Sequence, residues 1–567
     1  MLFSVPRQKP QDDLLPLFPR YYHDFMREIS SEELYEGLLG WGLFADKLPP
    51  MFTSEPFMQY CKTRNGAFAD QRANWIRFSY MRNINKKRLF GIPTPFAYER
   101  LVRCLSNNWN SLVKLFTDNT SQHPYRVSRI HIRHRKGTKS LFLMNYKNWR
   151  IDEDPLPALM VGSQFVVECD ISQCFPSIYT HAIDWAILGK DQAKKNSHGK
   201  VCCWSHNIDH FAMNITNGET HGLLIGPHAS NLLAEIILTR IDNSLFENGF
   251  RFIRHIDDYV CYTDSEADAH NFVIELETQL AQYGLSINQK KTSLRKLPTT
   301  KEEDWIRALS AFQPNRSNCK KNDVVQLLDA AVSAMEHSKG DVSTLNYAFK
   351  MLSKCTMNYW AKKYYSEMAL HFAYIFPYLL PIIEQHVFEA AKTSDRDIAI
   401  FSNLVFEKAL KERDYLSACY ALYYAIRYKF TMDSLREKST EKLIFESNDC
   451  MLLVCALVYS QYKDDGNFEN QLKKYAKNLA TDENDFFSNW LFVYEALDAN
   501  ELPEDPHKGA WKEIKRAGLS FIDRSSIERP FLNEVFFAEK AAAVKDLLSN
   551  SDEDTEIEES ENPPNEL

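Results

Sequence analysis

The stretch RHIDDYV, from Arg254 to Val260, places two aspartates side by side between residues that are typical of β-strands. The flanking runs FRFIRHI and YVCYTD are rich in aromatic and β-branched residues, so Asp257 and Asp258 are predicted to lie in or next to the turn of a hairpin. Adjacent carboxylates raise each other's pKa unless a cation lies between them. The pair therefore indicates either a metal site or an ordinary solvated turn.

A third acid and a long helix precede this hairpin. FVVECDIS (165–172) is a short apolar run with Asp170 near its end, which is typical of a buried central strand. The stretch 228–246 has apolar residues at helical spacing, namely Leu232, Leu233, Ile236, Ile237 and Ile241. Mg²⁺ is usually held by a few carboxylates and a substrate phosphate, and two such ions support phosphoryl transfer. One acid at a strand end that faces the acid pair would supply enough carboxylates for such a magnesium site.

Four stretches carry a family resemblance: CDISQCFPSIYTH (169–181), HGLLIGPHASNLLAEIILTRID (221–242), RHIDDYV and GLSINQKKT (284–292). They resemble motifs A, B, C and D of a reverse transcriptase palm, in that order. IPTPFAY, IYTH and IGPHASNLLAE are similar to the bacterial defence-associated reverse transcriptases, the abortive-infection and "unknown group" lineage. The resemblance covers about residues 85–300 and implies a DNA polymerase.

The resemblance implies metal binding by four groups. Asp170 and Asp257 would be the principal ligands, with Asp258 as the second acid of the pair. The backbone carbonyl of Ile171 would add a further ligand. The implied cofactor is a pair of Mg²⁺ ions, with Mn²⁺ as an alternative.

Substrate contacts are implied by the same resemblance. Phe175 falls where the family places an aromatic residue beneath the incoming sugar, which would exclude a 2′-hydroxyl and select dNTPs. Lys291 matches the motif D lysine that approaches the triphosphate and protonates the leaving pyrophosphate, and Lys290 is the neighbour that could be confused with it. Gly226, in the second motif, is assigned to nucleotide binding.

A basic stretch, residues 126–150, contains eight Lys or Arg and no acid. Such a patch on an otherwise nearly neutral chain favours local binding of phosphates. We predict that it forms the fingers and contacts the triphosphate or the template through Arg133, Arg135, Lys136 and Lys139. A solvated basic hairpin is the alternative interpretation.

The sequence departs from the family pattern at several positions. His255 stands where the family usually has an aromatic residue before the acid pair, and Leu224 and Ile225 stand where Pro and Gln are common. The missing Gln often contacts the incoming nucleotide in relatives that copy a template, so its loss puts ordinary templated fidelity in doubt. No thumb motif of the FLG type follows Lys296, so a conventional primer grip is not indicated.

CCWSHNIDH contains a possible zinc site of Cys202, Cys203, His206 and His210, with the two histidines on one helix face. Neighbouring cysteines rarely both reach one metal. We therefore favour satisfied polar residues over zinc at this position.

The overall prediction is an α+β protein in which reverse transcriptase fingers and palm are followed by an all-α helical-repeat domain. The predicted parts are a helical N-terminal region with the start of the fingers (1–120), fingers and palm (121–300), the repeat domain (301–550) and a disordered acidic tail (551–567).

A weak internal repeat supports the third part. The stretches DYLSACYALYYAI, DCMLLVCALVYS and DFFSNWLFVYEAL begin at Asp414, Asp449 and Asp485, at offsets of 35 and 36 residues. That period is typical of stacked helical hairpins and predicts a HEAT-like solenoid, with a non-repetitive bundle as the alternative. In the first unit, Tyr415, Cys419, Leu422 and Ile426 mark one apolar stripe at i, i+4, i+7 and i+11.

Composition sets the class of protein. The 567 residues are 44% hydrophobic and 25% charged, and much of the net charge of −9 comes from the tail, which holds eight acids and no base. Neither a long apolar run nor a signal-peptide pattern is present, so we expect no membrane association and a cytoplasmic location. Twelve cysteines without CxxC pairs predict reduced thiols.

Three functions are compatible with these patterns. The first is a Mg²⁺-dependent DNA polymerase in antiphage defence. Its lineage implies protein-primed synthesis, which some members carry out without a template, and DNA that is attached to a tyrosine. It also implies assembly into trimers or hexamers. The second is a conventional reverse transcriptase that copies RNA, such as a dedicated non-coding RNA. The third is a binding protein with an inactive palm, which the retention of Asp170, Asp257 and Asp258 argues against.

Overall fold

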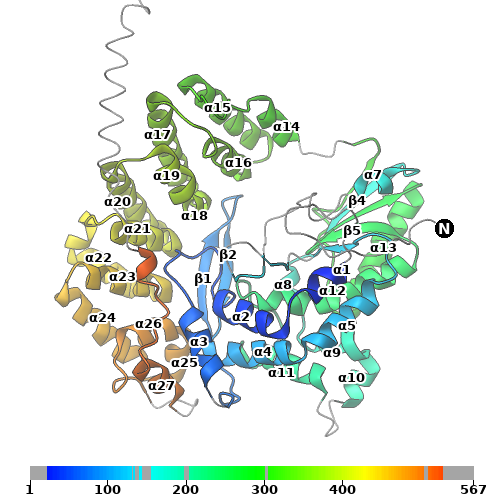
Figure 1. The fold of residues 1–567 in the computed structure, drawn as a ribbon, viewed down its shortest axis with the longest axis horizontal. Helices are drawn as coiled ribbons and strands as arrows, with labels where there is room; N and C mark the ends of the chain where they lie inside the picture. Colours follow the sequence, from blue (N-terminus) through cyan, green and yellow to red (C-terminus); the bar gives the residue numbers. More distant parts are fainter. Residues whose placement is uncertain are drawn as a thin grey trace, which may run out of the picture.

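The computed structural model describes residues 22–64, 66–129, 132–134, 139–142, 155–196, 203–299, 304–503 and 509–527 (Figure 1). The predictions made for Arg135, Lys136, Cys202 and the tail 551–567 lie outside the described residues.

Asp170 and the acid pair lie on or next to strands of a five-stranded sheet. Its order is β3-β5-β6-β4-β7, and all neighbouring strands are antiparallel except β3 and β5. The strands are β3 (Ser128–Arg129), β4 (Phe165–Asp170), β5 (Arg251–His255), β6 (Asp258–Thr263) and β7 (Ser293–Lys296). The predicted internal strand at 165–172 and the predicted hairpin around the acid pair are both confirmed.

The two faces of this sheet are covered to different degrees. Helices α12 (Ala229–Glu247) and α13 (Glu266–Gln282) contact strands of the sheet, and Val167, Phe252 and Tyr259 belong to the main hydrophobic core. Successive side chains of a strand point to opposite faces. Val166 and Tyr262 therefore belong to the other face, where they form a small separate cluster beside α7 (Leu156–Met160). Asp170 shares the face of Val166, so the acid lies on the less covered side.

The N-terminal region is mainly helical, as predicted, but it also contains a hairpin that the sequence did not reveal. Strands β1 (Ile76–Met81) and β2 (Lys87–Ile92) pair antiparallel, and β1 alternates buried and more exposed side chains. The helices are α1 (Tyr22–Arg27), α2 (Ser31–Trp41), α3 (Glu55–Thr63), α4 (Pro95–Asn107) and α5 (Trp109–Thr120). Pro95 at the first position of α4 has a φ suited to a helix start.

Four short helices connect β4 to α12. They are α8 (Cys174–Ser177), α9 (His181–Leu188), α10 (Lys190–Asn196) and α11 (Trp204–Asn214). Helix α11 packs on both α9 and α4, so this segment joins the palm to the N-terminal helices.

Helices follow the palm to the end of the described chain and form an arc that runs from α14, beside the palm, to α27, beside α3 (Figure 1). The longer ones are α14 (Asp304–Ala311), α15 (Lys321–His337), α16 (Ser343–Leu352), α17 (Tyr359–Ile375), α20 (Asp395–Glu412), α21 (Tyr415–Arg427), α22 (Lys438–Ser447), α23 (Cys450–Tyr462) and α24 (Gly466–Leu479). Short helices complete the arc: α18 (Leu380–Ile383), α19 (Glu389–Ala391), α25 (Glu483–Ser488), α26 (Trp490–Ala496) and α27 (Ala510–Arg516).

The three units of the predicted repeat fall on corresponding helices. They begin at α21, α23 and the pair α25–α26, and α23 packs on both α21 and α26. The stripe predicted for α21 is buried at Cys419, Leu422 and Ile426, and burial extends to every residue from Leu416 to Ile426. The reason is that α20, α23 and β1 all pack against α21.

The end of the arc contacts the N-terminal region. The backbone N–H of Thr53 donates to the carbonyl of Phe521 at 2.9 Å, and Tyr60 donates to Glu513 of α27. Within the described residues, no single helix has the length and apolar character of a membrane span. Two helices bent by 120° to each other, Tyr359–Ile375 and Pro377–Ala391, reach that length and composition only when they are taken together.

Candidate active site

The acid pair lies on a strained two-residue turn. His255 pairs with Asp258 across the hairpin, so Ile256 and Asp257 form its loop. Ile256 has a φ of 58°, in the left-handed region that β-branched residues rarely adopt. Two hydrogen bonds hold this turn: Ile171 N–H donates to the Asp257 carbonyl at 3.1 Å, and Arg254 Nη1 donates to the Ile256 carbonyl at 2.7 Å.

Arg254 anchors the turn to helix α12. Its side chain is 0% exposed and lies 2.7 Å from Asp242 Oδ2 and 3.0 Å from Glu235 Oε1. Asp242 also accepts a hydrogen bond from Ser128 of β3. Burial alone would lower the pKa of Arg254, but the two carboxylates raise it above its ordinary value. The guanidinium thus stays charged and joins motif B, motif C and β3 beneath the catalytic turn.

Asp170 lies directly opposite Asp258 in the register of β4 and β6. Asp170 is 8% exposed, and three groups hold it. Lys291 Nζ donates to Oδ2 at 2.5 Å, Asn288 Nδ2 donates to Oδ1 at 3.1 Å, and Asn288 N–H donates to the Asp170 carbonyl at 2.7 Å. Asn288 was not predicted from the sequence, although it lies in the quoted stretch GLSINQKKT.

The acid pair lies where its negative charge is unfavourable. Burial and the negative charge of Asp170 raise the pKa of Asp257. Desolvation and the charges of Asp257 and Asp170 raise the pKa of Asp258 to about 6. A cation at this position would relieve the repulsion.

The donor set suits Mg²⁺, which prefers carboxylate oxygens. Within the described residues, however, no three His, Cys, Asp or Glu side chains are arranged to enclose a metal ion. Mg²⁺ needs only one or two protein carboxylates when a substrate phosphate supplies the other ligands. Asp170 and Asp257, held together by the Ile171–Asp257 hydrogen bond, can fill that role.

Residues 99–320 match the family described as "Reverse transcriptase (RNA-dependent DNA polymerase)". The chain contains a reverse transcriptase domain. This match and the strand–helix–hairpin order place the palm motifs in a polymerase fold, and the domain indicates nucleotidyltransferase activity. No curated protein matches the sequence.

Two solved telomerases are among the similar structures, at low similarity. Apo telomerase from Candida tropicalis is 11% identical over 74% of this chain and 71% of that chain, with a TM-score of 0.30. Telomerase from Candida albicans, in complex with a TWJ fragment of telomeric RNA, is 12% identical over 78% of this chain and 69% of that chain, with a TM-score of 0.28.

Within the reverse transcriptase domain, motif B is attached to both motif A and the N-terminal hairpin. The carbonyl of Phe175 accepts a hydrogen bond from Leu223 N–H at 2.8 Å, and Gly91 N–H donates to the carbonyl of Ile225 at 2.9 Å. Gly226 has a φ of 130°, and a Cβ there would lie 3.1 Å from the carbonyl oxygen of Gly91. A side chain at 226 would therefore push the motif B loop away from β2. The nucleotide contacts of Phe175 and Gly226 stay predictions.

Arg133 and Lys139, the two described members of the predicted basic set, both contact side chains of the N-terminal helices. Arg133 is 9% exposed and lies 6.0 Å from the ring of Phe25. Lys139 Nζ lies 3.1 Å from Glu36 Oε2. Neither is joined to a catalytic acid by a described contact, and their binding of triphosphate stays a prediction.

Arg88 of β2 is a better placed cation that the sequence did not single out. Burial and Arg82 lower its pKa, while Asp257 and Asp170 raise it, so its guanidinium lies within electrostatic reach of both acids. The signal for it was absent because the hairpin that carries it, β1–β2, was not predicted.

The described residues of the zinc alternative do not form a metal site. Cys203 Sγ accepts a hydrogen bond from Ser205 at 3.2 Å, and His210 Nε2 lies 2.9 Å from Asp70. His206 and His210 do line a common pocket, which is considered below.

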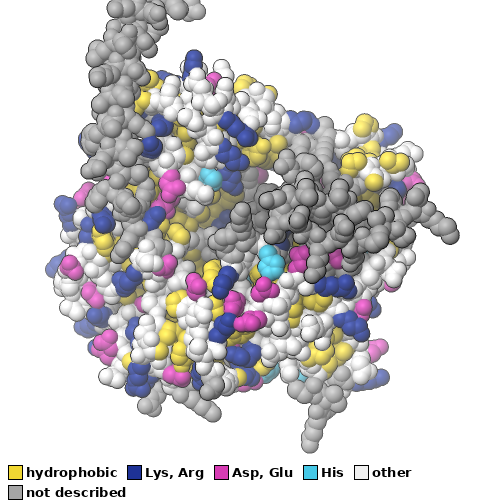
Figure 2. Space-filling model, viewed as in Figure 1, with side chains coloured by type: hydrophobic (Ala, Val, Ile, Leu, Met, Phe, Trp, Pro, Cys, Tyr) yellow, Lys and Arg dark blue, Asp and Glu magenta, His cyan; other side chains and the backbone are white. Residues whose placement is uncertain are grey.

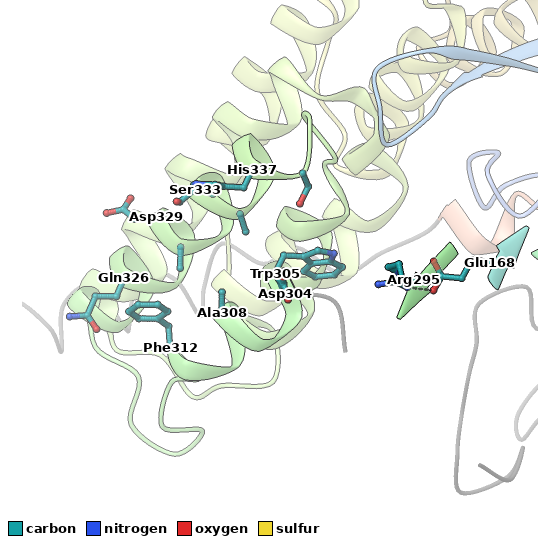
Figure 3. Close-up of a pocket in the computed structure, with 13 residues that line it drawn as sticks. Glu168, Arg295, Asp304, Trp305, Ala308, Phe312, Gln326, Asp329, Ser333 and His337 are labelled. Atoms are coloured by element: carbon teal, nitrogen blue, oxygen red, sulfur yellow. Dashed lines mark hydrogen bonds and ion pairs between the residues drawn. The ribbon is translucent and has the colours of Figure 1, made fainter. Parts of the chain in front are cut away.

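A groove of about 1020 Å³ adjoins the sheet of the reverse transcriptase domain (Figure 3). Its sheet side is the ion pair of Glu168 and Arg295, and its helix side comes from α14 and α15, where Trp305 and Phe312 lie. Glu168 is two residues before Asp170 and shares its face of β4. Among the described residues of its lining, three are acids, Glu168, Asp304 and Asp329, and one is an arginine. This balance disfavours a phosphate backbone inside the groove.

Proposed function

We propose that this chain is a DNA polymerase that joins dNTPs by two-metal nucleotidyl transfer. The observation that carries the proposal is the pairing of β4 with β6, which sets Asp170 opposite Asp258 while Ile171 bonds the Asp257 backbone. Asp170, Asp257 and the Ile171 carbonyl would hold the metal ions, with Asp258 beside them. The ions would supply charge neutralisation for the attacking and leaving oxygens.

Lys291 would exchange partners during this reaction. Its ammonium group now balances Asp170, and its side chain is 56% exposed. An arriving cation would balance Asp170 in place of the ammonium group, so the pair can separate when a cation and a triphosphate bind. Lys291 would then be free to bind the triphosphate and to protonate the pyrophosphate, as the resemblance implies. Arg88 would approach the triphosphate from β2.

The finer proposal is protein-primed, template-independent synthesis in antiphage defence by a homo-oligomer. It is supported by the IPTPFAY, IYTH and IGPHASNLLAE stretches, by Ile225 in place of the motif B Gln, and by the helical arc that follows the palm. The acidic groove beside β4 also fits a domain without a conventional duplex grip. Figure 2 shows Lys and Arg interspersed with Asp and Glu over one face, so phosphate contacts would be local rather than spread over that face.

Labelled dNTPs, supplied one at a time with Mg²⁺, test this proposal on the purified full chain. We expect DNA that stays with the protein through denaturing gels and phenol extraction and is released by protease only with a residual peptide. Asp257→Asn should abolish the product. Freely extractable DNA made only on an added primer and template would contradict protein priming but leave the polymerase intact.

RNA-templated synthesis is the second candidate, because the matched family is described as an RNA-dependent DNA polymerase. Sequencing the product and any co-purified RNA separates the two candidates. Faithful complementarity to that RNA would favour the conventional enzyme, and product of one or two nucleotides in arbitrary order would favour template independence.

A further inference from the structure

A second pocket, of about 530 Å³, lies between α4 and α11. These helices are at the lower edge of Figure 1, away from β4 and β5. The residues that line the pocket are Asp70, Arg100, Arg103, Cys104, Asn107, Asn108, His206, Asn207, His210 and Phe211. None of them is a catalytic acid or a residue that holds one, so this pocket is separate from the candidate active site.

Hydrogen-bond donors meet in this pocket because of helical spacing. Arg100, Arg103 and Asn107 follow one another at i, i+3 and i+7 on α4, and His206 and His210 are at i and i+4 on α11. Residues at these spacings share a helix face. Two packed helices therefore present their nitrogen-bearing side chains to one cavity.

Some of these groups are already committed to partners within the protein. Asp70 receives His210 at 2.9 Å and Asn214 at 2.7 Å, so the single lining acid is occupied. Arg103 Nε donates to Glu99 at 2.5 Å, and Arg103 Nη2 donates to Tyr35 at 3.1 Å. These contacts fix the walls of the pocket. They also engage the acceptor oxygens of Asp70, Glu99 and Tyr35.

Arg100 is held without a carboxylate. Its guanidinium lies 4.7 Å from the ring centre of Phe211, and its buried Nε has no hydrogen-bond partner in the part of the chain that the structure describes. An aromatic face orients a guanidinium but does not satisfy its N–H groups. Because Nε is buried, the terminal Nη groups are the atoms through which Arg100 would donate to an anion in the pocket, and such charge-assisted hydrogen bonds are strong.

We propose that this pocket binds a phosphate group through Arg100, with Arg103, Asn107 and His206 as further donors. The cavity is large enough for one nucleotide. The phosphate could belong to a free nucleotide or to a nucleic-acid strand, since both present the same oxygens. The site also gives a role to His206 and His210, which hold no metal in the described structure.

Binding is measured on the full chain in EDTA, so that metal-dependent binding at Asp170 and Asp257 does not contribute. The probes are a fluorescent ten-residue oligo-dT and, in competition, ADP and inorganic phosphate. For whichever probe binds, we expect Arg100→Gln to lower the affinity by about 10-fold or more, because a charge-assisted hydrogen bond is lost. The affinity of Arg100→Lys should lie between those of Arg100→Gln and the unmodified chain, since lysine keeps the charge but not the planar guanidinium group. The Asp257→Asn variant should bind as the unmodified chain does, whatever happens to DNA synthesis.

Arg64→Gln is the matched control, because Arg64 lies 4.3 Å from the ring of Phe68 in the same way but does not line the pocket. Competition by ADP or phosphate would identify a free-nucleotide site, and binding of oligo-dT alone would identify a strand site. Should Arg100→Gln not fold, the double variant Asn107→Ala with His206→Ala takes its place, with the same expected direction. Equal affinities in all variants, or no binding of any probe, would overturn the proposal.

Discussion

The two sides of the catalytic turn are held by ion pairs that differ in burial. On the covered side, Arg254 is 0% exposed between Asp242 and Glu235; on the open side, Lys291 is 56% exposed beside Asp170. Breaking a buried pair leaves an uncompensated charge and costs about 3–5 kcal/mol, whereas an exposed pair contributes about 0–1 kcal/mol. The buried group therefore fixes the turn, and the exposed pair is the one that can exchange for metal and substrate.

Arg254→Met should have the largest effect. It removes the only cation that contacts Asp242 and Glu235 among the described residues and releases the carbonyl of the strained Ile256. We expect the free energy of unfolding to fall by about 3–5 kcal/mol and DNA synthesis to disappear. Urea denaturation monitored by circular dichroism measures the first effect, and dNTP incorporation measures the second.

Arg251→Met is the matched control for this variant. Arg251 is on the same strand, but it is 41% exposed and pairs with the exposed Asp264 at 3.2 Å. Its loss should cost about 1 kcal/mol or less. Equal losses of stability in the two variants would contradict the distinction between the two kinds of ion pair.

Asp257→Asn should separate catalysis from stability. Nucleotide incorporation should fall at least about 100-fold, since a metal ligand is lost. Stability without Mg²⁺ should stay equal or increase, because burial and Asp170 already disfavour the charged form of Asp257. Asp264→Asn, directly after the far end of β6, is the control, and it should change neither nucleotide incorporation nor stability. Wild-type incorporation by Asp257→Asn would refute the proposed site.

The strands and the acids of this site could be predicted from the sequence, but their supports could not. Alternating and apolar runs gave β4, β5 and β6 because each pattern is local. Asn288 reaches Asp170 across 118 residues, and Arg254 reaches Glu235 across 19. Such contacts depend on how the elements pack and leave no local pattern. Arg88 was missed for the same reason, because β1–β2 is short and its register with motif B is set by Gly91 and Ile225.

Lys291→Gln should affect the reaction more than the fold. The Lys291 side chain is 56% exposed, but that of Asp170 is 11% exposed. A Gln amide at 291 can still donate to that carboxylate, so we expect the free energy of unfolding to fall by about 1 kcal/mol. The turnover rate should fall about 100-fold if Lys291 is the general acid, with a smaller change in the dNTP KM. Lys290→Gln is the control, since Lys290 is the adjacent exposed lysine. A loss with Lys290→Gln and none with Lys291→Gln would reverse the assignment.

Asp449 in the helical arc is a partly buried acid that contacts no cation among the described residues, so it should behave differently from Asp242 and provides the smallest test. Asp449 caps α23 by accepting a hydrogen bond from Leu452 N–H at 2.9 Å. Desolvation raises its pKa to about 6 from its ordinary value near 3.8. Ionisation therefore opposes folding, and this destabilisation grows as the pH rises from about 4 to about 6.

Asp449→Asn keeps an oxygen for the Leu452 N–H but removes the charge. We expect a gain of about 1 kcal/mol at pH 7, less than the full pKa shift implies, because the side chain keeps some contact with solvent. The gain should disappear below about pH 3, where Asp449 is protonated in both states. Thermal unfolding at the two pH values measures this difference. A variant that loses stability at pH 7 would show that the carboxylate charge at the helix start outweighs its desolvation.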